Sequence, residues 1–271
     1  MSRASRVALV ALAVTLVLAP LLTLHPAVTH LYEAGFANLS VEASHPQVIV
    51  FLALTAASAL PAAGFLLSLA AATRSREELR SLIEGSEPAC LGGIHYRIFS
   101  SDVVVMFTAG PFRPIVFVSS EAVRTLSSPE LHAALLHERA HQRNGDVLWG
   151  LLLRAVGKAF AFLPQTSRMV QMAALRAECE ADEYAIRGGA RRSDLFEAIA
   201  AASPPPAKPV SAAISDANVE LRLVRLVHPG TPLPGHPTRG FLALAATVVV
   251  PAVLAHVVAI VAAVCTTSFA S

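Results

Sequence analysis

The chain has 271 residues, of which 54% are hydrophobic and only 15% are charged, against about a quarter charged in an average soluble domain. This composition excludes a disordered or fibrous protein and argues against an ordinary soluble one. The 21 Lys and Arg nearly balance the 19 Asp and Glu and form no basic tract, so no nucleic-acid partner is indicated. The three cysteines are odd in number and far apart in the sequence, which argues against both a disulfide framework and a CxxC metal knuckle.

Three apolar segments are long enough to cross a bilayer, which takes about 20 residues of helix. They are residues 7–24, 48–72 and 241–264, and none of them contains Asp, Glu, Lys or Arg. We expect all three to be membrane helices. For the first we prefer an uncleaved anchor, because no A-x-A cleavage site follows Leu24, and a signal peptide is the alternative.

The placement of the basic residues predicts the orientation of these spans. All Lys and Arg lie either before the first span or between the second and the third, and the loop 25–47 contains none. Because cytoplasmic flanks carry the excess of positive charge, we expect the N-terminus and the region 74–240 in the cytoplasm. The loop 25–47 and the C-terminus are then extracytoplasmic, and the sequence leaves open whether that loop senses a ligand.

Two runs rich in β-branched and aromatic residues follow the second span, at 103–108 and 114–118. Ala109-Gly110-Pro111 separates them, and Gly and Pro are typical of a turn between strands. The sequence therefore predicts a short hairpin or strand pair within 94–119.

A helix is predicted to begin after Ser127, where a cap residue is followed by Pro129 and Glu130. Its apolar pattern continues until Asn144-Gly145, a pair typical of a helix end. The motif His137-Glu138-Arg139-Ala140-His141 lies on this predicted helix.

Histidines at i and i+4 lie on one face of a helix, so His137 and His141 can bind the same tetrahedral Zn²⁺ ion. Glu138 lies beside the first of them, next to the position left open for water. Zinc in such a site lowers the pKa of its water, and Glu138 would take the proton and deliver it to the leaving amine. The motif thus predicts one zinc per chain and peptide-bond hydrolysis, with chance occurrence as the alternative.

A catalytic zinc of this type needs a third protein ligand. A helix predicted over 166–187 carries Glu178 and Asp182 at i and i+4, on one face. We assign Glu178 as the ligand and Asp182 as the acceptor that orients a ligand histidine. Cys179 is the alternative soft ligand, although an idle thiol is the preferred interpretation, and Glu180 is expected to be solvent-exposed.

The stretch 147–163 is apolar and almost long enough to cross a membrane. We exclude a crossing, because it would place Glu178 on the other side of the membrane from the two histidines. Arg154 and Lys158 stand one turn apart and give this helix a basic stripe. Two interpretations remain open, a helix lying on the bilayer surface and a helix packed in the domain core.

The motifs occur in the order of two spans, a strand pair, S-x-x-E-L-x-A-x-L-x-H-E-x-A-H, an E-x-x-x-D helix and a last span. This order resembles the BlaR/MecR-type membrane metallopeptidases and is similar, more distantly, to the HtpX and Ste-type membrane proteases. The resemblance implies a gluzincin site with His137, His141 and Glu178 as ligands and Glu138 as base. It also implies that a strand within 103–118 binds substrate as an extended chain.

The string Glu220-Leu-Arg222-Leu-Val-Arg225-Leu226 resembles a late E-x-R-x-x-R-L helix of the related proteases. In those proteins an arginine helps to organise the site, and the resemblance makes Arg222 the candidate here. A solvated amphipathic helix with no part in the site is the alternative.

We therefore expect a mainly α-helical membrane protein with a small α+β zincin-like (gluzincin) metalloprotease domain. Residues 1–73 form the N-terminal membrane region, 74–240 the cytoplasmic metalloprotease domain, and 241–271 the last span with a short tail. The expected activity is zinc-dependent cleavage of a protein substrate at the cytoplasmic membrane face, in regulation or quality control. The alternative is a membrane signalling or scaffold protein with a structural zinc site, although such a site would not need the base Glu138.

Overall fold

The structure is a computed structural model. It describes the backbone of residues 2–34, 46–202, 212–233, 235, 238–247, 250 and 254, and their side chains except at 19, 22–34, 46–58, 71–76 and 212–218. The chain divides into two compact units. Unit 1 comprises residues 71–151 and 170–236, and unit 2 comprises residues 2–70, 152–169 and 237–271.

Unit 1 contains a four-stranded sheet in the order β1-β2-β4-β3. The strands are β1 Ser86–Leu91, β2 Ile94–Phe99, β3 Met106–Ala109 and β4 Ile115–Ser119. Strands β1 and β2 pair antiparallel, as do β3 and β4, whereas β2 and β4 pair parallel. Of the two predicted arrangements, a hairpin or a strand pair, the structure shows a hairpin, β3–β4, and it adds a second hairpin, β1–β2, which we did not predict.

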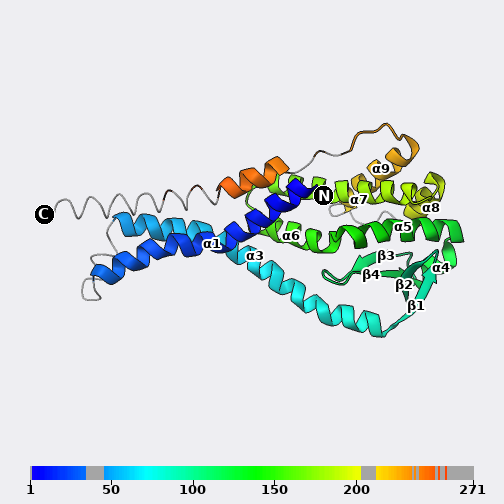
Figure 1. Cartoon of the computed structure of the whole chain (residues 1–271), viewed down its shortest axis with the longest axis horizontal. Coiled ribbons are helices and arrows are strands. Elements are labelled where there is room, and N and C mark those ends of the chain that lie inside the picture. The colour runs from blue at the N-terminus through cyan, green and yellow to red at the C-terminus, as the bar shows by residue number, and fades with distance from the viewer. Residues whose placement is uncertain are drawn as a thin grey trace. The chain divides into compact units, whose positions relative to one another are not determined.

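The central helix of unit 1 is α5 (Ser128–Asn144), and Figure 1 shows it between the sheet and the helices α8 and α9. The other elements of this unit are α4 (Ser120–Thr125), most of α7 (Pro164–Arg187), α8 (Arg192–Ala202) and α9 (Ala212–Val227). One apolar core joins the sheet to these helices, with Val116, Val118, Leu135, Leu195 and Leu226 among its buried residues. Because α5 packs on both sides, most of its surface is buried.

The ends of α5 follow the signals in its sequence. The Ser127 N–H donates to the Glu130 carboxylate at 2.8 Å, which satisfies one of the backbone donors left over at a helix start. Gly145 ends the helix in the left-handed conformation, with φ of 64°, which costs glycine little because it has no β-carbon. Helix α6 (Asp146–Ala159) begins at the next residue.

Unit 2 contains α1 (Arg3–Ala34), the first part of α3 (Pro46–Glu84), the second part of α6 and the residues that follow it. Leu12, Phe160 and Phe241 are among its fully buried side chains. A β-carbon on Gly64 of α3 would lie 3.4 Å from Ala159 Cα, so α3 and α6 approach closely at this point.

The segment 147–163 forms α6 and the turn after it. Leu153 and Val156 are buried, whereas Arg154 and Lys158 are exposed. These buried residues belong to unit 2, where the helix approaches α3, and not to the core of the sheet-containing unit 1. The basic stripe of the helix lies on the exposed side.

A search of the described residues finds no helix that is long and apolar enough to cross a membrane. Each predicted span also includes residues outside the description. In the first two spans these are side chains only, at 19 and 22–24 in the first and at 48–58 and 71–72 in the second, and in the third span they are most of residues 248–264.

Candidate metal centre

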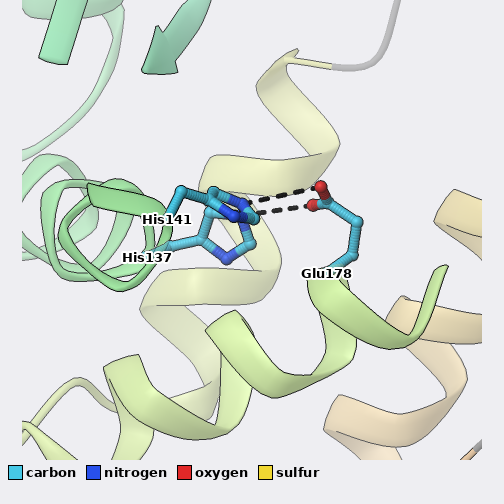
Figure 2. A group of neighbouring side chains, drawn as sticks. All are labelled: His137, His141 and Glu178. Carbon is cyan, nitrogen blue, oxygen red and sulfur yellow. Dashed lines mark hydrogen bonds and ion pairs between the residues drawn. The ribbon is translucent and has the colours of Figure 1, made fainter. Parts of the chain in front are cut away.

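Three side chains from two helices of unit 1 meet at one point, as Figure 2 shows. His137 and His141 project from the same face of α5, and Glu178 projects from α7. The two Nε2 atoms are 3.1 Å apart, and they lie 3.3 and 3.5 Å from the Glu178 carboxylate oxygens. In the part of the chain that the structure describes, this is the group of His, Cys, Asp and Glu side chains that could hold a metal ion.

Each histidine of this group is held from behind by a carboxylate. Asp182 of α7 lies 2.8 Å from His137 Nδ1, and Asp146 of α6 lies 2.9 Å from His141 Nδ1. A carboxylate at Nδ1 accepts a hydrogen bond from the N–H of that nitrogen, so in the neutral ring Nε2 keeps its lone pair for a metal ion. Both rings are therefore oriented to bind through Nε2, toward Glu178.

Arg222 of α9 lies behind the site and connects two of its carboxylates. Its guanidinium donates two hydrogen bonds to Asp182, at 2.8 and 2.9 Å. A third nitrogen lies 3.0 Å from Glu178 Oε2, and the side chain is largely buried. Arg222 thus fixes the orientation of the carboxylate that holds His137 and of the proposed ligand carboxylate.

Glu138 is buried next to His137 and faces the sheet. Thr108 Oγ1 of strand β3 lies 2.7 Å from Glu138 Oε2 and 3.2 Å from the Glu138 backbone carbonyl. The hydroxyl has one proton, and the closer carboxylate oxygen is its preferred acceptor. Among the described residues, Thr108 is the side chain that hydrogen-bonds this carboxylate.

Comparison with known families gives one result. A profile of the family described as BlaR1 peptidase M56 matches residues 47–223 of this chain. The chain belongs to the BlaR1 peptidase M56 family. No curated protein and no solved structure gives a significant match.

The matched region runs from α3 to α9 and includes every residue of the centre described above. The family is one of metallopeptidases, and in this BlaR1-type peptidase the group His137, His141 and Glu178 is a possible metal site. The resemblance that we inferred from the order of the motifs is therefore confirmed at the level of the family.

In this BlaR1-type peptidase, the surroundings of both histidines raise their pKa. Burial opposes the charged form of His141, but hydrogen bonds to Asp146 and Glu178 outweigh it and raise its pKa to about 10. The same balance, with Asp182 in place of Asp146, raises the pKa of His137. Burial favours neutral Glu178, but the two histidines hold its pKa well below the usual range. A metal ion must therefore displace protons from the rings.

The structure brings together all of the site residues that we named from the sequence. Asp182 lies within hydrogen-bond distance of His137, and Arg222 contacts the site, whereas the alternative for it was a solvated helix face. The neighbouring Cys179 is buried. Glu180, which we expected to be solvent-exposed, is half-buried and pairs with Arg176 at 2.8 Å, so that expectation was wrong.

Sequence reasoning missed two residues of this BlaR1-type centre. Asp146 follows Gly145 directly and resembles an ordinary acidic residue in the first turn of a helix, which hides its contact with His141. Its position, five residues after the second histidine and just past a glycine that turns the chain, was the available signal. Thr108 resembles a normal strand residue, and no pattern in the sequence connects it to Glu138.

Proposed function

We propose that this chain is a zinc-dependent endopeptidase that cleaves a protein substrate at the cytoplasmic face of the membrane. We propose regulation or quality control as its role. The observation that carries the proposal is the meeting of His137, His141 and Glu178, with Glu138 on the same helix turn. A purely structural metal site needs ligands but no base, so the buried Glu138 favours the enzyme over the scaffold protein.

The spacing of the donor atoms supports zinc as the metal. Zinc binds His nitrogen and carboxylate oxygen at about 2.0–2.2 Å, so two ligands of a tetrahedral ion lie about 3.3 Å apart. The three separations observed here are 3.1, 3.3 and 3.5 Å. Two neutral imidazoles, one carboxylate and a fourth position for water form the usual donor set of a catalytic zinc. We therefore propose one zinc ion per chain.

Each residue of the site has a separate task in this proposal. Bound zinc would supply a Lewis acid and a lowered pKa for the attacking water. Glu138 would accept the proton of that water on its carboxylate and deliver it to the nitrogen of the leaving amine. Asp182 and Asp146 hold the protons on the Nδ1 atoms, and Arg222 holds the Asp182 and Glu178 carboxylates in place.

The substrate would lie along β3, the edge strand of the sheet. Strand β3 pairs with β4 on one side only, and an exposed edge can bind an extended peptide through backbone hydrogen bonds. Because Thr108 connects this strand to Glu138, a peptide bound there would lie close to the proposed base.

The membrane location is the part of the proposal that rests on composition. Three segments lack charged residues, and all basic residues lie on the side assigned to the cytoplasm. Within unit 2, α1 buries Leu9 and Leu12 but also exposes Val7, Val14 and Leu21. A helix that is apolar on all sides is typical of a membrane span or a buried core, and this supports a lipid environment for α1.

The test compares the full-length protein with its Glu138→Gln variant. Both are loaded with zinc, zinc content is measured by mass spectrometry, and cleavage of fluorescein-labelled β-casein is followed. We expect equal zinc, one ion per chain, and a fall in kcat of about 100-fold or more in the variant. Equal zinc with no cleavage by either protein would instead favour the scaffold alternative, and equal cleavage by both would exclude Glu138 as the base.

A further inference from the structure

In strand β3, the backbone N–H and C=O groups of Met106 and Thr108 face the open edge of the sheet. Ser119 N–H donates to the Val105 carbonyl at 2.9 Å, and these residues lie opposite each other in the register of β3 and β4. One backbone hydrogen bond joins them, and Val105 N–H donates to Ser119 Oγ at 3.1 Å. This bond marks a hydrogen-bonded position, and such positions alternate with non-hydrogen-bonded ones along an antiparallel ladder. Thr108 therefore belongs to a non-hydrogen-bonded pair, with its backbone N–H and C=O directed away from β4.

The side chain of the same residue points into the site. Alternate side chains along a strand lie on opposite faces, and Phe107 stacks with Phe117 on one face while Thr108 contacts α5 on the other. Its Oγ1 lies 2.7 Å from Glu138 Oε2. Thr108 thus offers its backbone to the edge where a peptide would bind and its hydroxyl to the group that would move the proton.

We propose that Thr108 is a positioning residue that holds the Glu138 carboxylate in its working orientation for a peptide bound along β3. This inference rests on the proposed function. The hydroxyl engages Oε2 and fixes the plane of the carboxylate, so that Oε1 is left to accept the proton of the attacking water. A threonine suits this role because its branched side chain has few rotamers and prefers strands.

This arrangement predicts which kinetic parameter depends on the hydroxyl. Replacing Thr108 by valine keeps the backbone, the branching and the approximate shape, and removes only the hydrogen bond. Peptide binding through the backbone is then preserved, so KM stays close to its original value. The proton transfer loses its positioned base, so kcat falls.

The experiment measures cleavage of fluorescein-labelled β-casein by the zinc-loaded full-length protein. We expect Thr108→Val to lower kcat roughly 10- to 100-fold, with KM and zinc content unchanged. Thr108→Ser, which retains the hydroxyl, should stay within about threefold of the unmodified protein. Thermal unfolding is followed in each variant by the fluorescence of Trp149, the chain's single tryptophan, so that loss of folding is seen directly.

Thr125 provides a matched control, because its hydroxyl also donates to a glutamate, Glu121, at 2.9 Å but on the exposed surface of α4. Thr125→Val should leave kcat unchanged. The inference is overturned if Thr108→Val keeps its kcat, if the loss appears in KM or zinc content, if Thr108→Ser is equally impaired, or if Thr125→Val has the same effect. No cleavage by the unmodified protein would overturn the proposed function, and with it the role of Thr108.

Discussion

The two histidines of the centre stand one turn apart on α5, but their surroundings come from different parts of the chain. His141 takes its partner from Asp146, five residues later, across the turn at Gly145. His137 takes its partner from Asp182 on α7, and that carboxylate is in turn held by Arg222 on α9. One half of the centre is thus built locally, and the other half needs three helices.

This difference shows where the site is sensitive to changes elsewhere in the fold. The contact at His141 depends on one helix end and one turn. The contacts at His137 depend on the packing of α7 and α9 and on an ion pair between largely buried groups. A disturbance of the helix packing should therefore reach the metal through His137 and Glu178 before it affects His141.

The largest expected effect is the loss of stability caused by Arg222→Met, which removes the cation that pairs with Asp182 behind His137. The variant leaves Asp182 buried with one partner fewer, and loss of one member of a buried ion pair costs about 3 kcal/mol in the free energy of unfolding. Thermal and denaturant unfolding of the metal-free protein, followed by Trp149 fluorescence, measures it. Arg191→Met is the control, because Arg191 pairs with Asp194 at the surface, where such pairs contribute at most about 1 kcal/mol. Equal losses in the two variants would contradict the distinction between the halves.

The two halves of the centre can be compared directly by replacing the carboxylate behind each histidine, Asp182 or Asp146, with the corresponding amide. Asp182→Asn and Asp146→Asn should each lower zinc affinity roughly 10- to 100-fold, as measured by competition with a chromophoric chelator. We expect the larger loss for Asp182→Asn, because Asp182 also binds Arg222. Asp194→Asn, away from the centre, should leave the affinity unchanged, and a larger loss for Asp146→Asn would reverse the comparison.

The smallest expected effect is the dependence of zinc affinity on pH, which arises at His141 in the locally built half of the centre. The pKa of His141 in the metal-free protein is raised from 6.5 to about 10. This proton therefore stabilises the fold fully below about pH 6.5, and the contribution is lost as the pH rises toward 10. Zinc competes with the same proton, so its affinity should rise by up to about tenfold between pH 7 and 8.

The local carboxylate is a cause of that raised pKa, and this gives the control for the pH experiment. Asp146→Asn removes the charged partner of His141, so the rise of zinc affinity with pH should move to lower pH in this variant. Isothermal titration in two buffers of different ionisation heat measures the protons released. Zinc affinity that does not change between pH 7 and 8 would contradict a protonated ring at His141.

The parts of the site that could be predicted are those with a periodic signal. The spacing of His137 and His141, and of Glu178 and Asp182, follows from helical geometry, and the caps at Ser127 and Gly145 identify the helix that carries the motif. Contacts between elements leave no such signal. The bond from Thr108 to Glu138 depends on how β3 lies against α5, which the sequence does not encode in any spacing.

The sheet, too, could be predicted only in part, because one of its hairpins has a clear sequence signal and the other does not. The hairpin β3–β4 has β-branched strands around a Gly-Pro turn and was predicted, whereas β1 and β2 contain Pro88, Cys90 and Arg97 and lack a clear alternation. Gly92 and Gly93 have φ of 58° and 74°, as expected for a two-residue hairpin turn with Gly-Gly. That dipeptide was the available signal for the missed hairpin.

The left-handed turn at Gly145 also bears on the order in which the centre can assemble. It closes a contact between residues only five apart, and contacts of short sequence separation cost little loop entropy and form early in folding. The pairing of Arg222 with Asp182 joins residues 40 positions apart and requires α9 to dock. His141 is thus expected to be oriented during the first stages of folding, and His137 and Glu178 only when the last helix of unit 1 is in place. Capture of the metal would then mark the end of folding of this unit rather than its beginning.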